Sequence, residues 1–417
     1  MGEERQATGQ PSGFREFIVL MALTMSLVAL SIDMMLPAFP AMARDLAVAQ
    51  PNDIQLIISL MFIGLAIGQL FYGPLSDSVG RKPAMHAGFA ILMLGSLISL
   101  FATDFTTMLV GRFMQGFGAA GPRAVAMALI RDRFRGSEMA RVMSFIMTIF
   151  ILVPILAPAL GQGILLIAGW RTIFAVFIGF SIAVQLWIGL RQPETLAPEH
   201  RRPFTMVSIG TGLLEVVRCR AAMAYTLVAG GVFGAFMGYL NSCQQVFQLQ
   251  YGLGKLFPLL FGGMAFSTGI AAVVNGQLVL RFGMHRLSRR ALYAVTLLSW
   301  LLLAISWAYG GHPPLWIFLA IGVGWFFCIG IVFGNINSMA MEPLGHVAGS
   351  AAAVIGTSTT FMAVGLGYLI GGAYDGTLLP MTVGFAVLTA VSSLLTAIVE
   401  APREAARKKR WRKNAGG

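Results

Sequence analysis

Long apolar runs alternate with short polar stretches along almost the whole chain. An α-helix needs roughly 20 apolar residues to cross about 30 Å of hydrocarbon, and twelve runs of this kind can be marked. They are residues 17–38, 53–74, 84–102, 105–128, 142–167, 171–190, 222–243, 256–280, 291–309, 314–337, 348–372 and 379–399. The runs are continuous and do not alternate with a period of two, which excludes an outer-membrane β-barrel. The pattern predicts an all-α integral membrane protein with twelve transmembrane helices.

The composition strengthens this interpretation. Of the 417 residues, 57% are hydrophobic and 11% are charged, whereas a soluble globular domain carries about 25% charged residues. A water-soluble chain this apolar would have too few polar residues to cover its surface. The apolar runs also leave no stretch long enough for a sizeable soluble domain. Residues 1–16 are polar. The run after them is too long for a signal-peptide core, so we expect it to be retained as the first span.

The Lys and Arg residues are concentrated in every second loop between the apolar runs. The formal net charge is +12, which in a soluble protein would suggest a nucleic-acid partner. If the N-terminus is cytoplasmic and the spans alternate, about 24 of the 29 Lys and Arg residues lie on the cytoplasmic side. This is the positive-inside pattern. We therefore expect both termini to be cytoplasmic, membrane lipid as a partner and no nucleic acid. The basic tail is expected to be a solvated stop-transfer anchor, and contact with anionic lipid head groups is the alternative.

No motif of catalysis or metal binding stands out in the sequence. The three cysteines, Cys219, Cys243 and Cys328, are dispersed without metal-ligand spacing, so free thiols are expected. The five histidines form no cluster, and HExxH, GxSxG and Walker-type motifs do not occur. We therefore expect no metal, no cofactor and no enzymatic activity.

The chain divides into two halves at its longest interior hydrophilic stretch, residues 191–208. A short repeat supports the division, because Gly73 and Gly80 recur as Gly276 and Gly283 at an offset of 203. Two pseudo-symmetric six-helix halves are typical of transporters with a cavity between the halves. The predicted domains are an N-terminal six-helix half (1–190), a cytoplasmic linker (191–220), a C-terminal six-helix half (221–400) and a basic cytoplasmic tail (401–417).

Three stretches resemble signatures of one transporter family. "GPLSDSVGRKPAM" (73–85) resembles the loop signature of the major facilitator superfamily. "VGRFMQGFGAAG" (110–121) is similar to the fourth-helix motif of its drug–proton antiporters. "PALGQGI" (158–164) resembles the fifth-helix antiporter motif, with Ala157 and Gln162 in place of two of its glycines. The resemblance implies the major facilitator fold.

Two further stretches point to one branch of that family. "SIDMMLPAFPAMARDL" (31–46) and the segment 348–381 resemble the bicyclomycin and chloramphenicol resistance branch, except that Met35 stands where the branch has Tyr. The resemblance implies proton-coupled efflux of small hydrophobic drugs by alternating access. It also implies a monomer in the bacterial inner membrane, driven by the proton gradient without a cofactor.

Asp33 is an acid inside the first apolar run, where a charge at a helix centre costs about 2.5–3.5 kcal/mol on insertion scales. Burial favours the neutral form of a carboxyl and water favours its charged form, so such a group can carry a proton. We interpret Asp33 as a proton-coupling site that the substrate also reaches. The alternative is a structural acid that pairs with a cation or caps a helix near Pro37 and Pro40.

Arg112 is the matching cation inside the fourth run. Spacings of three and four residues place Gln115 and Arg123 on the same helical face as Arg112. We interpret Arg112 as coupled to Asp33, directly or through Gln115 and water. The alternative is an arginine that only pins helices together. The sequence leaves Arg123 open between a structural and a functional role.

Two more groups of residues are assigned to conformational change. An ionic latch at an inner gate is expected from Gly73, Asp77, Gly80, Arg81, Lys82, Arg131 and Asp132. The alternative is a plain turn with solvated charges. A hinge is expected from Pro154, Pro158 and Gly161, because proline removes a helical hydrogen bond.

The substrate cavity is expected to be apolar and adaptable, because methionine and aromatic side chains suit hydrophobic ligands of varied shape. Its candidate residues are Asp33, Met34, Met35, Gln115, Phe236, Tyr239 and Phe361. Three other functions remain open: proton-coupled export of a metabolite such as an amino acid or sugar, inward symport, and a membrane enzyme or receptor. The last would need a catalytic cluster or an extramembrane ligand domain, and the sequence shows neither.

Overall fold

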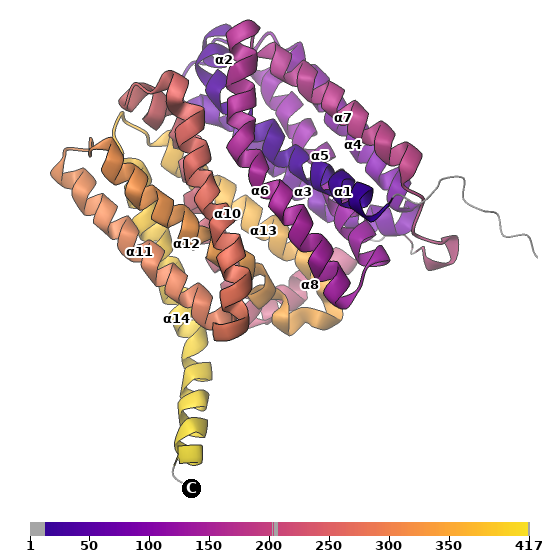
Figure 1. Cartoon of the computed structure of the whole chain (residues 1–417), viewed down its shortest axis with the longest axis vertical. Coiled ribbons are helices and arrows are strands. Elements are labelled where there is room, and N and C mark those ends of the chain that lie inside the picture. Colours follow the sequence, from indigo (N-terminus) through magenta and orange to yellow (C-terminus); the bar gives the residue numbers. More distant parts are fainter. Residues whose placement is uncertain (1–12, 202, 204–206, 416–417) are drawn as a thin grey trace, which may run out of the picture. The chain divides into compact units, whose positions relative to one another are not determined.

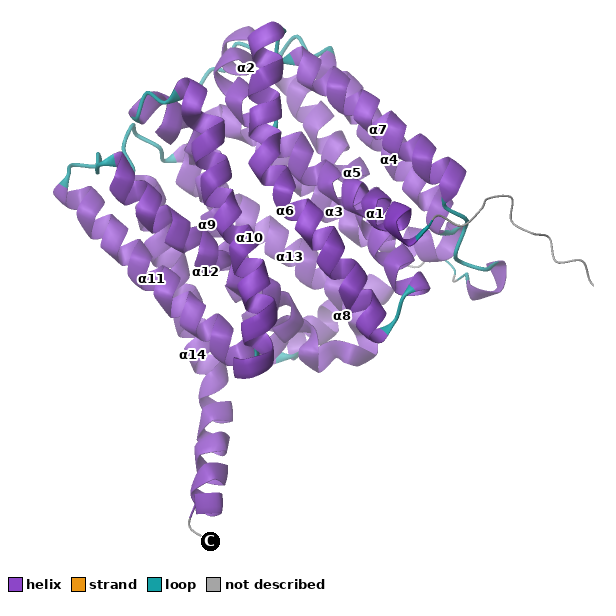
Figure 2. Cartoon of the chain, viewed as in Figure 1, coloured by secondary structure: helices purple, strands orange, loops and turns teal. Residues whose placement is uncertain are grey.

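The computed structural model describes residues 13–201, 203 and 207–415, and all regular elements among them are helices (Figure 2). Twelve of the described helices have 20 residues or more. They are α1 (Phe14–Asp33), α3 (Leu56–Val79), α4 (Arg81–Leu100), α5 (Phe105–Arg133), α6 (Gly136–Ile167), α7 (Arg171–Arg191), α9 (Arg220–Gln245), α10 (Phe257–Phe282), α11 (Met284–Ala308), α12 (Leu315–Met341), α13 (Ala348–Gly372) and α14 (Leu379–Ala415). The all-α membrane fold is confirmed, and the long helices follow the twelve apolar runs in order.

Ten helices within the described part of the chain are long and apolar enough to cross a membrane. The fourth and fifth predicted spans are not among the ten. The helix α5 carries Arg112 and Arg123, which lower its hydropathy, and in α6 only Leu152–Ile167 counts as a shorter apolar stretch. The short helices α2 (Phe39–Asp45) and α8 (Val207–Arg218) complete the set of α-helices.

Local chemistry explains where several helices begin. Asp104 precedes α5, and its carboxylate accepts hydrogen bonds from the backbone N–H of Thr107 at 2.8 Å and from the Thr107 hydroxyl at 2.6 Å. These bonds hold the pKa of Asp104 below its usual range. The helices α4 and α11 each begin after a glycine with positive φ, Gly80 at 110° and Gly283 at 77°. The sequence repeat therefore corresponds to a repeated backbone turn.

The chain forms two compact units (Figure 1). Unit 1 comprises the chain up to Val207 together with Cys243–Gly269, and unit 2 comprises Ser208–Ser242 together with the chain from Ile270 onward. The boundaries cut through α9 and α10. These units are defined by internal contacts, whereas the predicted halves are defined by the repeat, so the division at 191–220 stays a prediction.

In unit 1, α5 packs against α3 and α4 almost backbone to backbone. A Cβ atom added to Gly116 would lie 1.9 Å from the Met61 carbonyl oxygen, and one added to Gly95 would lie 2.3 Å from the Gln115 backbone nitrogen. Small residues allow this close approach between membrane helices. The same glycines hold Arg112 and Gln115 at a fixed depth within the unit.

In unit 2, α11 packs against α12 and α14. Trp325 of α12 stacks on Phe385 of α14 with ring centroids 3.9 Å apart. A second aromatic group joins α9 to α12, where Tyr239 lies 4.9 Å from Phe326 in an edge-to-face contact. Aromatic pairs of this geometry add to the stability supplied by burial alone.

Candidate functional site

Asp33 is the last residue of α1, and the chain leaves the α-helix immediately after it. A 3₁₀ turn, η1 (Leu36–Ala38), contains Pro37, and α2 follows. Asp33 is 6% exposed. No hydrogen bond or ion pair connects its carboxylate to any residue that the structure describes. The cation pair and the helix cap, which were the structural alternatives, are therefore not formed in this conformation.

Arg112 lies at the centre of unit 1 and is fully buried. Its Nε atom donates to the Ile57 carbonyl at 3.2 Å, and its Nη1 atom donates to the Ser31 carbonyl at 3.3 Å. Nη1 also contacts the Gln115 side-chain oxygen, and Nη2 lies 2.8 Å from the Met61 sulfur. The guanidinium thus joins α5 to α1 and α3 through uncharged acceptors.

Arg112 and Asp33 form no ion pair in the described structure. The connection between them runs through the backbone of α1, because the Ser31 carbonyl that accepts from Arg112 lies two residues before Asp33. Gln115 is the second member of this network and donates to the Ser96 hydroxyl of α4 at 2.9 Å. A displacement of α1 would therefore change the surroundings of both charged side chains.

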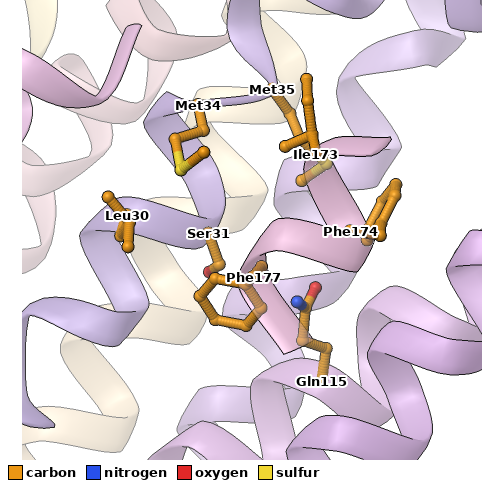
Figure 3. Close-up of a pocket in the computed structure, with 8 residues that line it drawn as sticks. All are labelled: Leu30, Ser31, Met34, Met35, Gln115, Ile173, Phe174 and Phe177. Carbon is orange, nitrogen blue, oxygen red and sulfur yellow. The ribbon is translucent and has the colours of Figure 1, made fainter. Parts of the chain in front are cut away.

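A small cavity lies beside this network (Figure 3). Its volume is about 10 Å³, and it is lined by Leu30, Ser31, Met34, Met35, Gln115, Ile173, Phe174 and Phe177. Figure 3 shows Gln115 at one end and the two methionines at the other. This volume approaches the minimum for one water molecule, whereas drug-sized ligands occupy about 300–1,000 Å³. The cavity brings three of the predicted substrate residues, Met34, Met35 and Gln115, together.

The other predicted substrate residues belong to unit 2. Tyr239 is fully buried against Phe326. Phe236 makes edge-to-face contacts with Phe326 and Phe333. Phe361 of α13 is 43% exposed. A cavity shared with Asp33 stays a prediction.

Gly161 of α6 touches the backbone beside Asp33. A Cβ atom at Gly161 would lie 1.9 Å from the carbonyl oxygen of Met34, the residue after Asp33. Pro158 and Pro154 lie within the same helix, about one and two turns earlier, respectively. The antiporter-like stretch of the sequence therefore packs directly on the end of α1, and its use as a hinge stays a prediction.

Three of the predicted latch residues, Asp77, Arg81 and Asp132, form a compact ionic cluster in unit 1, which we call the Arg81 cluster. Arg81 is 5% exposed and pairs with Asp77, and its Nε atom donates to Asp132 at 3.0 Å. Its Nη1 atom also donates to the Ser76 hydroxyl at 2.9 Å. These contacts join α3, α4 and α5 where Gly80 turns the chain, so these three charges are paired rather than left in solvent.

Glu194 completes this cluster and was not identified from the sequence. Its two carboxylate oxygens accept hydrogen bonds from the backbone N–H groups of Arg81 at 3.0 Å and Lys82 at 2.9 Å. The carboxylate thus caps the N-terminus of α4, where a negative charge is favourable. This turn favours glycine because its φ is 110°, and a Cβ atom at Gly80 would also lie 2.8 Å from the carboxylate of Glu194.

A family model for the Major Facilitator Superfamily matches residues 21–368, which include Asp33, Arg112 and the Arg81 cluster. This chain belongs to the major facilitator superfamily. The family consists of membrane transporters, not enzymes, in agreement with the sequence prediction. The chain is therefore a multi-pass membrane protein with small-molecule substrates.

Individual relatives agree with this membership. The transporter is 33% identical over 385 residues to the uncharacterised MFS-type transporter YdgK of Bacillus subtilis (strain 168), across 90% of this chain and 93% of that one. It is 30% identical over 393 residues to a bicyclomycin resistance protein homolog of Haemophilus influenzae, across 90% and 94% of the two chains. The resemblance to the bicyclomycin resistance branch is confirmed.

A solved structure supports the fold independently. The crystal structure of the human organic anion transporter MFSD10 (TETRAN) is similar with a TM-score of 0.67 at 17% sequence identity. The similarity covers 94% of this chain and 100% of that chain. At this level of identity, the likeness shows the major facilitator fold alone.

Three predicted latch residues of this major facilitator transporter, Gly73, Lys82 and Arg131, take no part in the described ion pairs of Arg81. Gly73 lies inside α3 in open space rather than in the turn, and its carbonyl accepts from Ser76 at 2.9 Å. Lys82 donates its Nζ hydrogen to the Gly189 carbonyl at 2.6 Å. Arg131 and Arg123 are exposed, and no ion pair links either to a described acid.

Proposed function

We propose that this transporter is a drug:proton antiporter that exports small hydrophobic compounds across the bacterial inner membrane. The observation that carries the proposal is Asp33, a buried acid without a described partner at the end of α1. An ionised carboxylate is costly to bury without a partner, so its closed environment suits the protonated form. The bicyclomycin resistance homolog of Haemophilus influenzae supports the substrate class.

Proton and drug compete for Asp33 in the proposed cycle. When the cavity opens outward, Asp33 takes a proton and the drug leaves. When it opens inward, the proton leaves as a new substrate binds. A proton that crosses about 100 mV supplies about 2.3 kcal/mol, and one pH unit adds about 1.4 kcal/mol. This sum concentrates a neutral drug a few hundred-fold, so the proton gradient suffices without a cofactor.

Arg112 supplies a fixed positive charge close to α1. Because it bonds the Ser31 and Ile57 carbonyls, its charge keeps a defined position while Asp33 changes its protonation state. Arginine holds its charge in a low-dielectric interior and forms several directed hydrogen bonds at once. The Arg81 cluster acts as the latch that keeps α3, α4 and α5 together and opens during rocking.

The remaining parts of the proposal concern the setting of the transporter. Both termini are cytoplasmic, the protein works as a monomer, and the basic tail lies near anionic lipid. Phe236, Tyr239 and Phe361 contribute the second half of the substrate wall. Their aromatic surfaces suit hydrophobic drugs.

The substitution Asp33→Asn tests the proton role, because asparagine keeps the shape of the side chain and cannot ionise. We expect drug resistance in an efflux-deficient host to disappear while the protein still inserts in the membrane. Asp104→Asn is the matched control, because asparagine also caps helices well and Asp104 lies in a loop. Full resistance in the Asp33→Asn variant would refute the proposal.

Everted vesicles separate antiport from its rivals. Adding a chloramphenicol-like compound to acidified vesicles should release protons from their interior. A symporter would move protons in the opposite direction, and an exporter of sugars or amino acids would respond to those compounds instead. In the Asp33→Asn variant, no drug-dependent proton movement is expected.

A further inference from the structure

A second cluster of ionisable side chains lies in unit 2, outside the site described above. His285 and Arg289 come from α11, Tyr225 from α9, Glu400 from α14, and Glu342 from η6 (Glu342–Val347), the link between α12 and α13. Glu400 is 5% exposed. We call these five residues the His285 cluster.

The imidazole of His285 lies between two glutamates. Its Nδ1 atom is 3.1 Å from Glu400 Oε1, and its Nε2 atom is 3.2 Å from Glu342 Oε2. A carboxylate only accepts hydrogen bonds, and a neutral imidazole has one N–H. Both contacts can be hydrogen bonds at the same time only if one more proton is present. The imidazolium form supplies this proton and donates from both ring nitrogens.

Two other members of the cluster, Tyr225 and Arg289, also contact Glu400. The Tyr225 hydroxyl lies 3.3 Å from both Glu400 Oε1 and His285 Nδ1, and Arg289 Nη1 lies 3.4 Å from Glu400 Oε2. The Glu342 side chain is 45% exposed, whereas that of Glu400 is 6% exposed. Water can replace the imidazole at Glu342 when the ring loses its second proton. The hydrogen bond between His285 and Glu342 is therefore the one that breaks when the ring becomes neutral.

In the sequence repeat, His285 occupies the position that corresponds to Lys82 in the first copy. The offset of 203 that relates Gly80 to Gly283 also relates Lys82 to His285. Lys82 follows the left-handed turn in unit 1 and donates to Gly189 near the end of α7, and His285 follows the equivalent turn and bonds Glu400 near the end of the membrane span of α14. A charge that is permanent near neutral pH in one unit is replaced in the other by a group that changes charge between about pH 5 and 8.

We propose that His285, Glu342 and Glu400 form a second proton-binding site, in which one proton joins α11 to α14 and to the link between α12 and α13. We call the two hydrogen bonds from His285 to Glu342 and Glu400 the tie. Both form while the ring is an imidazolium, and one is lost as the pH rises and the ring becomes neutral. This site makes the predicted cytoplasmic end of unit 2 responsive to the pH that surrounds it. Its part in the transport cycle rests on the proposed drug:proton exchange, whereas proton binding at His285 does not.

Nitrogen NMR of the imidazole groups tests proton binding directly in the purified full-length protein. The chain has five histidines, and His285→Gln identifies the His285 signals by their loss. We expect both ring nitrogens of His285 to be protonated at pH 7, and Glu400→Gln to move this titration to lower pH. A neutral His285 ring at pH 7 would overturn the proposal.

Thermal unfolding as a function of pH tests the tie. Since the bound proton stabilises the folded form, the melting temperature of the wild type should fall as the pH rises and the ring becomes neutral, and His285→Gln should lose most of this pH dependence. His285→Lys should also flatten the profile, because lysine stays charged over the range in which the wild-type ring becomes neutral. His312→Gln, at an exposed loop histidine, is the matched control. An unchanged profile in His285→Gln would contradict the tie.

The two proposals fail separately. Asp33→Asn should abolish drug exchange and leave the His285 nitrogen signals unchanged. If His285 titrates as expected but drug exchange is missing in the wild type, the proposed antiport is wrong and the second proton site stands. If drug exchange is present but His285 is neutral at pH 7, only the second site is wrong.

Discussion

Arg112 keeps its charge in the interior of unit 1 without pairing to a described acid. Backbone carbonyls of Ser31 and Ile57, the Gln115 amide oxygen and the Met61 sulfur surround its guanidinium instead. These acceptors stay uncharged whether Asp33 is protonated or ionised. Acceptors of this kind are compatible with the proposed proton exchange at Asp33, which a tight ion pair would oppose.

The substitution Arg112→Lys tests whether charge alone is sufficient. Lysine keeps the charge but has a single ammonium group in place of the planar fork, so it cannot reach α1, α3 and Gln115 together. We expect at least about a tenfold loss of drug-dependent proton release in everted vesicles, equal to about 1.4 kcal/mol. Arg135→Lys, at an exposed position beside α6, should remain active. If Arg112→Lys exchanges drug for protons as fast as the wild type, the hydrogen bonds of the planar guanidinium are not needed and the positive charge alone is sufficient.

For single residues, the sequence identified the charged side chains inside apolar runs but not the groups that they contact. Asp33 and Arg112 could be found because a charge inside an apolar run is costly, whatever surrounds it. The acceptors of Arg112 could not be found, since a backbone carbonyl has no sequence signal and Ser31 is 81 positions away. Glu400 was also missed, because it lies at the end of its apolar run, where an acid looks solvated.

Helix positions were predictable, and their close contacts were not. The apolar runs and the cap at Asp104 mark helices through local chemistry. Glu194 caps α4 from 112 positions away, so no local pattern reveals it. Glycines were visible in the sequence, but Gly161 and Gly163 differ only in what they face. Gly161 meets the Met34 carbonyl, whereas nothing lies within 4 Å of a Cβ atom at Gly163.

This glycine pair gives a prediction for α6. In Gly161→Ala the new methyl group would lie 1.9 Å from the Met34 oxygen, so α1 or α6 must shift. We expect a loss of roughly 1–3 kcal/mol in stability, as for overpacked cores, together with reduced drug exchange. Gly163→Ala should be tolerated. The melting temperature and the drug-dependent proton release in vesicles should be measured for both variants. Equal values for the two would show that the close contact at Gly161 is not important.

The repeat provides an argument about the whole molecule that does not depend on how the two units are placed. Six long helices, α4, α5, α6, α7, α9 and α10, lie between the turns at Gly80 and Gly283. An even number of membrane crossings returns the chain to the side from which it started. Because all six are predicted spans, we expect the Arg81 cluster and the His285 cluster to face the same side of the membrane. The positive-inside pattern predicts that this side is the cytoplasm, because basic residues gather in these loops.

Two exposed histidines test this orientation. His200 lies in the segment between α7 and α8, and His312 lies between α11 and α12. In a variant whose three native cysteines are replaced by serine, a membrane-impermeant thiol reagent added to intact cells should label His312→Cys and leave His200→Cys unlabelled. Both should label after lysis. The reversed pattern would place both clusters outside, and the predicted direction of drug export would then be wrong, because the proton would enter from the side assigned to its release.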